Sequence, residues 1–230
     1  MTVRPSDDLA ATFARLGGEE DGEVWSELWD GLCHQGEVYE DSFLALPYLE
    51  AIVAGRAAGE VQEAVLMAGL IASVADGEHS ARYAAEFAVL LPVARRLLDA
   101  ATDDRPSFVY LLQCLLAFEG ERVWSAGRLE GLFYEEYEVD CPVCESTLFI
   151  AFGDHGTFAS AGDYVMADPV KTALLPADLA ALGPLAARLH RMATEAGHEE
   201  VARGLTYLFG GATCPDCVGD FVVSEQVECR

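Results

Sequence analysis

Apolar residues recur every three or four positions through most of the first 135 residues, which is the spacing of amphipathic α-helices. In Gly22–Cys33, for example, this spacing puts Trp25 and Trp29 on one stripe. Glycine, aspartate and proline positions separate the stripes and mark where helices start and stop. The pattern predicts helices at residues 22–33, 41–55, 60–75, 80–101, 106–118 and 121–133.

Two of the predicted helices share a motif that suggests an internal repeat. Ala45–Leu49 reads Ala-Leu-Pro-Tyr-Leu and Leu90–Ala94 reads Leu-Leu-Pro-Val-Ala, so each places a proline inside an apolar helix, about 45 positions apart. Repeats of this length built from helical pairs are typical of HEAT and armadillo arrays. The first ~120 residues therefore resemble a short HEAT-like array, and Trp25–Leu49 resembles the opening of uncharacterised bacterial HEAT-like proteins. The resemblance implies a fold and says almost nothing about activity.

The pattern changes after Tyr134. Short β-type runs and a turn at Asp154–Gly156 replace the helical stripes, and two helices are expected near residues 176–196 and 199–209. This change predicts a helical domain over residues 1–135 and a second domain over residues 136–230, packed as one unit with the first. Strands are expected at residues 146–152, 157–160, 163–167 and 221–223.

Two Cys-Pro-x-Cys motifs carry the clearest chemistry, Cys141-Pro-Val-Cys144 and Cys214-Pro-Asp-Cys217. Four thiolates complete a tetrahedral zinc shell and leave no open position, which makes the centre structural. The two motifs lie much farther apart than the roughly 15–20 residues of an ordinary zinc ribbon, which predicts a split ribbon with helices inserted between its halves. The predicted fold is therefore mainly α, a HEAT-like helical-pair array with a small antiparallel β zinc-ribbon element in its C-terminal half and one structural zinc per chain.

The four cysteines also allow other chemistry. Two disulfides, a redox Cys-x-x-Cys pair and a rubredoxin-like iron site remain open alternatives. His155, at the turn close to the first motif, is an alternative metal ligand.

No residue carries a catalytic signature, so no catalytic or cofactor-binding residue is assigned. Cys33 and His34 are adjacent, but neighbouring helix residues point about 100° apart, which favours a packing or turn role. A metal- or thiol-dependent enzyme is kept as an alternative, and it requires an open coordination position or a depressed pKa at Cys33. Trp25 and Trp29 are expected to form a core wall, or else to anchor a partner.

The net charge is −25, from 39 acidic and 14 basic residues. Such a surface repels phosphate backbones and anionic lipids, which argues against direct nucleic-acid or membrane binding. It favours either solubility or a basic protein partner. Ala64–Ala75, among the longest apolar stretches, is too short to cross a bilayer, and Met1–Leu16 lacks the pattern of a secretory signal, so a cytoplasmic location is expected.

These features favour a non-enzymatic protein-interaction module, such as an immunity or adaptor protein. A second alternative to this function is an acidic DNA mimic. It requires Glu135, Glu136, Glu138 and Asp140 to align with N-terminal acidic residues like phosphates along one face.

Overall fold

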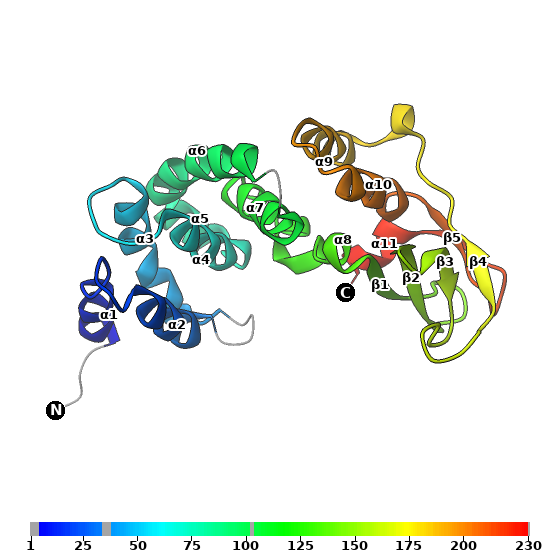
Figure 1. Cartoon of the computed structure of the whole chain (residues 1–230), viewed down its shortest axis with the longest axis horizontal. Coiled ribbons are helices and arrows are strands. Elements are labelled where there is room, and N and C mark those ends of the chain that lie inside the picture. The colour runs from blue at the N-terminus through cyan, green and yellow to red at the C-terminus, as the bar shows by residue number, and fades with distance from the viewer. Residues whose placement is uncertain (1–4, 34–37, 102–103, 230) are drawn as a thin grey trace. The chain divides into compact units, whose positions relative to one another are not determined.

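The computed structural model describes residues 5–33, 38–101 and 104–229 (Figure 1). The chain divides into two compact units. The N-terminal unit comprises residues 1–100 and 110–127, and the C-terminal unit comprises residues 101–109 and 128–230, so the division falls within one helix, α7. Among the described residues, no helix combines the length and the apolar character needed to cross a membrane.

The N-terminal unit is helical. Its core is a set of fully buried side chains from α3, α4, α6 and the second half of α7, and α3 packs against both α4 and α6. The segment after α7 does not continue as the predicted helix over residues 121–133, because Ala126 and Gly127 leave helical geometry and Gly127 has a φ of 80°. The elements are α1 (Pro5–Phe13), α2 (Asp21–Leu32), the 3-10 helix η2 (Glu40–Ala45), α3 (Leu46–Val53), α4 (Val61–Ser73), α5 (Gly77–Arg82), α6 (Ala84–Ala100), α7 (Arg105–Phe118) and the short turn η3 (Trp124–Arg128).

The two prolines of the predicted repeat occupy different positions. Pro92 lies inside α6, as expected. Pro47 instead lies in the first turn of α3, directly after η2, where its missing N–H costs no helical hydrogen bond. The prediction of a proline inside the second helix was therefore wrong. The prolines mark one helix interior and one helix start, and the HEAT-like arrangement stays a hypothesis.

The C-terminal unit combines helices with antiparallel β-structure. Four strands pair in the order β1-β2-β3-β4, and β5 pairs with β6. The mutual hydrogen bonds of Leu175 and Gly211 connect the end of the β4 segment to the start of β5. The elements are α8 (Gly131–Tyr134), β1 (Glu136–Asp140), β2 (Thr147–Gly153), β3 (Gly156–Ser160), β4 (Lys171–Ala173), the 3-10 turn η4 (Leu179–Ala181), α9 (Pro184–Glu195), α10 (Glu199–Leu208), β5 (Gly211–Thr213), β6 (Asp220–Val222) and α11 (Val223–Glu228).

One face of the four-stranded sheet forms the core of this unit. Helix α10 packs on β2, α11 packs along β1, and α9 packs on α10 (Figure 1). The alternation along β2 buries Leu148, Ile150 and Phe152, and Gly204 and Tyr207 of α10 lie against Phe152. The apolar face of the strand, which repeats every two residues, therefore packs against the apolar face of the helix, which repeats every 3.6 residues.

The third predicted strand, over residues 163–167, was wrong. The Asp163 carboxylate accepts hydrogen bonds from the backbone N–H groups of Val165 and Met166, which closes a turn there. Val165 and Met166 are exposed, so their apolar character reflects no burial. The strand that pairs with β3 is Lys171–Ala173 instead.

Candidate metal centre

The first Cys-Pro-x-Cys motif is the loop that joins β1 to β2. Asp140 and Thr147 are the last pair in register before the loop. Inside it the Cys141 N–H donates to the Ser146 carbonyl at 2.9 Å, and the Glu145 N–H donates to the Cys141 carbonyl at 2.9 Å. Glu145 takes a left-handed conformation with a φ of 62°. These bonds fold the loop into a tight knuckle that carries Cys141 and Cys144 side by side.

The second motif repeats this geometry between β5 and β6. Thr213 and Asp220 are the last pair in register. The Cys214 N–H donates to the Gly219 carbonyl at 2.9 Å, and the Val218 N–H donates to the Cys214 carbonyl at 3.0 Å. Val218, with a φ of 61°, is the counterpart of Glu145. The two knuckles are therefore the same structural unit built twice.

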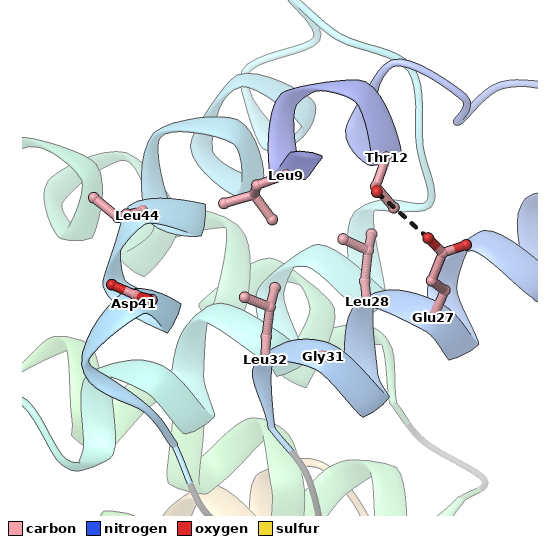
Figure 2. Close-up of a pocket in the computed structure, with 8 residues that line it drawn as sticks. All are labelled: Leu9, Thr12, Glu27, Leu28, Gly31, Leu32, Asp41 and Leu44. Carbon is pink, nitrogen blue, oxygen red and sulfur yellow. Dashed lines mark hydrogen bonds between the residues drawn. The ribbon is translucent and has the colours of Figure 1, made fainter. Parts of the chain in front are cut away.

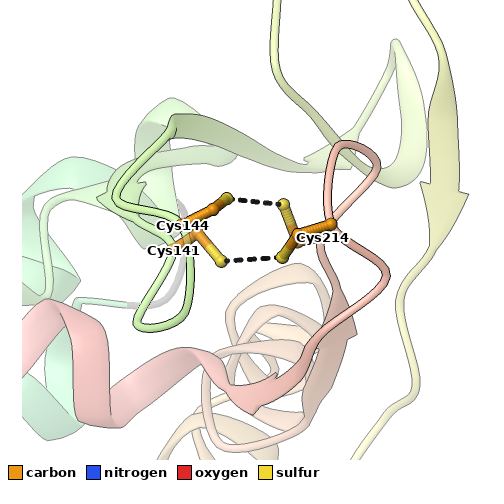
Figure 3. A group of neighbouring side chains, drawn as sticks. Cys141, Cys144 and Cys214 are labelled. Atoms are coloured by element: carbon orange, nitrogen blue, oxygen red, sulfur yellow. Dashed lines mark hydrogen bonds between the residues drawn. The ribbon is translucent and has the colours of Figure 1, made fainter.

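The knuckles bring four sulfur atoms together. Cys141 Sγ lies 3.6 Å from Cys217 Sγ, and Cys144 Sγ lies 3.8 Å from Cys214 Sγ. Figure 3 shows Cys141 and Cys144 on one loop facing Cys214 on the other. All four sulfurs lie within 4.8 Å of one another. A tetrahedron with metal–sulfur bonds of ~2.3 Å has edges of about 3.8 Å, so this spacing fits one metal ion.

The same distances exclude cystines in this structure. A disulfide requires its sulfurs to be about 2.05 Å apart, and each of the chain's seven cysteines is a free thiol. The first cysteine of each knuckle faces the second cysteine of the other. Sulfurs from both knuckles therefore surround one common centre, which is compatible with a single shared ion.

The environment of the thiols favours cation binding. A hydrogen bond with the Ser146 hydroxyl and one from the Ser146 backbone N–H lower the pKa of Cys144 to about 6. Burial raises the pKa of Cys214. At Cys217 the Gly219 backbone N–H favours the thiolate, but burial and the three neighbouring sulfurs outweigh it and raise the pKa to about 12. The Cys144 thiolate thus forms readily, and the protons of Cys214 and Cys217 leave when a cation balances the charge.

Burial of the cluster is uneven. Cys141 and Cys214 are buried, Cys217 is partly exposed and Cys144 is exposed. The cluster therefore has one face inside the unit and one face toward solvent. Solvent access through the second face provides a route for the ion.

The other sequence candidates lie outside the cluster. His155 contacts the ring of Tyr164 edge-on at 5.6 Å and is not part of the group of ligand atoms. Burial raises the pKa of Cys33 to about 11, which is the opposite of the activation that a thiol-dependent enzyme needs. His34 lies outside the described residues. Burial likewise raises the pKa of Cys114, which packs against Gly69.

The two tryptophans of α2 differ in their surroundings. Trp25 is buried in the core. Trp29 is half-buried and donates a hydrogen bond from Nε1 to the Glu63 carboxylate of α4 at 2.9 Å. Trp25 therefore fits the core-wall interpretation, whereas Trp29 is only partly buried and contacts α4 through its hydrogen bond.

The acidic segment around β1 is largely engaged in contacts within its own unit. Glu135 binds Arg105, Glu136 accepts a hydrogen bond from the Tyr164 hydroxyl, and Asp140 accepts one from Thr147. These carboxylates point to different partners, and their arrangement provides no support for a phosphate-like row.

The sequence pattern did not predict one charged cluster, which centres on Arg105. Its Nη1 lies 2.5 Å from Glu135 Oε1 and 3.0 Å from Glu200 Oε2. Glu135 Oε2 also accepts the Asp154 backbone N–H at 3.0 Å, and the approach is so close that Gly153 has no room for a Cβ. Glu135 ends α8 in a left-handed conformation, with a φ of 61°, where glycine is usual. No local pattern links Arg105 to Glu200, because they are 95 positions apart.

Comparisons of the chain with protein-family models, curated proteins and solved structures found no match.

Proposed function

We propose that this chain is a non-enzymatic protein-binding module whose C-terminal unit is held together by one structural zinc ion. The observation that carries the zinc proposal is the closed group of four thiols, Cys141, Cys144, Cys214 and Cys217, within 4.8 Å of one another. Four cysteine ligands fill a tetrahedral zinc shell and leave no position for substrate or activated water. Such a centre stabilises a fold and does no chemistry of its own.

Zinc is favoured over other metals by the donor set and its closure. Four thiolates in tetrahedral arrangement suit zinc or iron, and a closed shell of this kind is the usual form of a structural zinc site. The zinc would connect two hairpins whose facing cysteines, Cys144 and Cys214, are 70 positions apart. Closing so long a loop is entropically costly without a ligand, so metal binding contributes directly to folding of the unit.

Elemental analysis of freshly purified, reduced protein tests the metal. We expect one zinc per chain, and less than half an equivalent after reconstitution with excess zinc would contradict the assignment. Cobalt substitution gives an independent readout, since tetrahedral cobalt–thiolate centres absorb in the visible range. A Cys144→Ser variant should weaken that absorption, whereas Cys229→Ser, an exposed cysteine outside the cluster, should leave it unchanged.

The charge supports the second part of the proposal. A net charge of −25 attracts basic proteins over long range and repels nucleic acids and anionic membranes. An immunity or adaptor role fits this charge, with a basic toxin or enzyme as the partner. The buried, high-pKa Cys33 and the closed shell of thiols offer nothing comparable in favour of an enzyme.

The partner part is tested with the products of neighbouring genes. We expect a basic one to bind the purified chain in titration calorimetry, with affinity that falls as salt is raised. If none of these products binds at low salt, and zinc is present in full, the interaction proposal fails while the metal assignment stands.

A further inference from the structure

The N-terminal unit has a small groove between α1, α2 and η2 (Figure 2). Its volume is about 300 Å³. We call it the leucine groove. It is lined by Leu9, Thr12, Glu27, Leu28, Gly31, Leu32, Asp41 and Leu44.

The floor of the leucine groove is apolar. Leu28 and Leu32 lie one helical turn apart on α2 and are buried, and Leu9 points toward them from α1 (Figure 2). Leu44 of η2 completes the lining. Gly31 leaves the α2 side of the groove open, because it has no side chain and a Cβ there would meet nothing within 4 Å. At this volume, near the lower limit for ligand pockets, the groove takes one or two apolar side chains.

The rim of the groove is acidic. The charged residues that line it are Glu27 and Asp41, which stand on opposite sides of Leu28 and Leu32 in Figure 2. Glu27 is paired with Arg15 at 2.6 Å, so its charge is partly balanced. Asp41 is exposed, and among the described residues that line the groove none is basic. A cation next to Asp41 would therefore gain an electrostatic partner at little desolvation cost.

We propose that the leucine groove is the docking site for a basic, amphipathic helix of a protein partner. An apolar side chain of that helix inserts between the four leucines, and a lysine or arginine on the same helix lies beside Asp41. Docking of the apolar face of an amphipathic helix into a hydrophobic groove is a recurring mode of protein recognition. The inference rests on the proposed function and deepens it, because it names where the basic partner binds and what chemistry it presents.

The test uses a synthetic amphipathic peptide of leucine and lysine, and its affinity is measured by calorimetry. Gly31→Leu should block the groove and weaken binding at least about tenfold, while Gly22→Leu on the same helix, outside the groove, should not. Both variants add a better helix former, so both should remain folded. Asp41→Lys should weaken binding, and Glu195→Lys, an equal change in charge at an exposed position of the C-terminal unit, should weaken it much less.

Several results would overturn the proposal that the leucine groove is a docking site. Equal weakening by Asp41→Lys and Glu195→Lys, or no effect of Gly31→Leu, would mean that the peptide binds the acidic surface at large. That outcome leaves the proposed function standing. Dimerisation of the free chain that Gly31→Leu abolishes would identify a second copy as the occupant and would also overturn the proposal. If neither the peptide nor any basic protein binds, the proposed function fails as well.

Discussion

Asp140 and Thr213 occupy equivalent positions in the two knuckle hairpins, and their hydrogen-bonding roles are exchanged. Asp140 accepts a bond from Thr147 Oγ1 at 3.0 Å, whereas Thr213 donates one from Oγ1 to Asp220 at 2.6 Å. In both hairpins an aspartate and a threonine therefore close the last pair of residues before the cysteines. The same hydrogen bond, with donor and acceptor strands exchanged, supports the same loop geometry. The candidate metal centre therefore depends on the geometry of the loop and not on which strand carries the aspartate.

Loss of one knuckle cysteine should destabilise the C-terminal unit. Cys141→Ser removes a metal ligand that is buried, and we expect a loss of more than about 2 kcal/mol in the free energy of unfolding of the zinc-loaded protein. Thermal unfolding followed by circular dichroism measures this, with and without chelator. Cys229→Ser is the matched control and should behave like the parent. If Cys141→Ser and the parent were equally stable and equally insensitive to chelator, the centre would not hold a structural metal.

The left-handed residue of the second knuckle should tolerate a stabilising substitution. Val218 is a β-branched residue with a φ of 61°, and its side chain is exposed, so it incurs backbone strain without the benefit of burial. Val218→Asn should raise the free energy of unfolding by about 0.5–1 kcal/mol, because asparagine tolerates this conformation. Val143→Asn is the control. Val143 is also exposed but lacks a positive φ, and its substitution should give no gain.

Acid should weaken the ion pair of Glu135. Hydrogen bonding to the Arg105 guanidinium lowers the pKa of Glu135 below its usual value. The stabilisation is therefore complete above the unfolded-state pKa of about 4.3 and is lost as the pH falls through the lower folded-state value. Glu135→Gln should lower the stability by about 1–3 kcal/mol at neutral pH.

Chemical denaturation across pH provides the measurement for Glu135. The difference between the parent and Glu135→Gln should shrink below about pH 4. Glu200→Gln, which breaks the exposed bond to the same arginine, should cost much less at every pH because solvent screens that pair. A pH-independent difference for Glu135→Gln would show that the carboxylate acts through packing and not through charge.

Two glycines of the N-terminal unit should respond to alanine with opposite signs. A Cβ at Gly69 of α4 would lie 2.2 Å from Cys114 Sγ and 2.9 Å from Cys114 Cα, so Gly69→Ala forces the helices apart and should cost about 1–3 kcal/mol. A Cβ at Gly22 of α2 meets nothing within 4 Å, so Gly22→Ala should stabilise by up to about 1 kcal/mol. Urea denaturation of both variants checks the contrast. A neutral Gly69→Ala would mean that α4 and α7 pack less closely than described.

The cysteine spacing predicted the four residues of the candidate metal site, and the helical periodicity predicted α2, α4, α7 and α10 to within about two residues. These features are local, since a stripe or a Cys-x-x-Cys turn is complete within a few residues. The predictions of one helix over residues 80–101 and of a helix starting near residue 176 missed the break at Tyr83 and the late start of α9 at Pro184. Both misses concern capping geometry, which apolar spacing does not encode.

Other features depend on contacts between distant residues. Acidic and apolar residues alternate along β1. Its hydrogen-bonded pairing with β2 establishes the segment as a strand. The carboxylate of Glu135 holds Arg105, and this contact accompanies a left-handed residue where the local sequence has no glycine. The sequence around Glu135 does not indicate that Arg105 is its partner, because the contact arises from the three-dimensional fold alone.

The crossed sulfur pairs have a consequence for the continuity of the chain. With an ion bound, the fragments on either side of a cut in the exposed segment between β3 and β4 would each contribute two of its ligands. A protease that nicks this segment would then release no peptide, because the ion would connect the halves in addition to the packing of α10 and α11 against the sheet. The centre would then act as a reversible cross-link between the two fragments of a cleaved polypeptide.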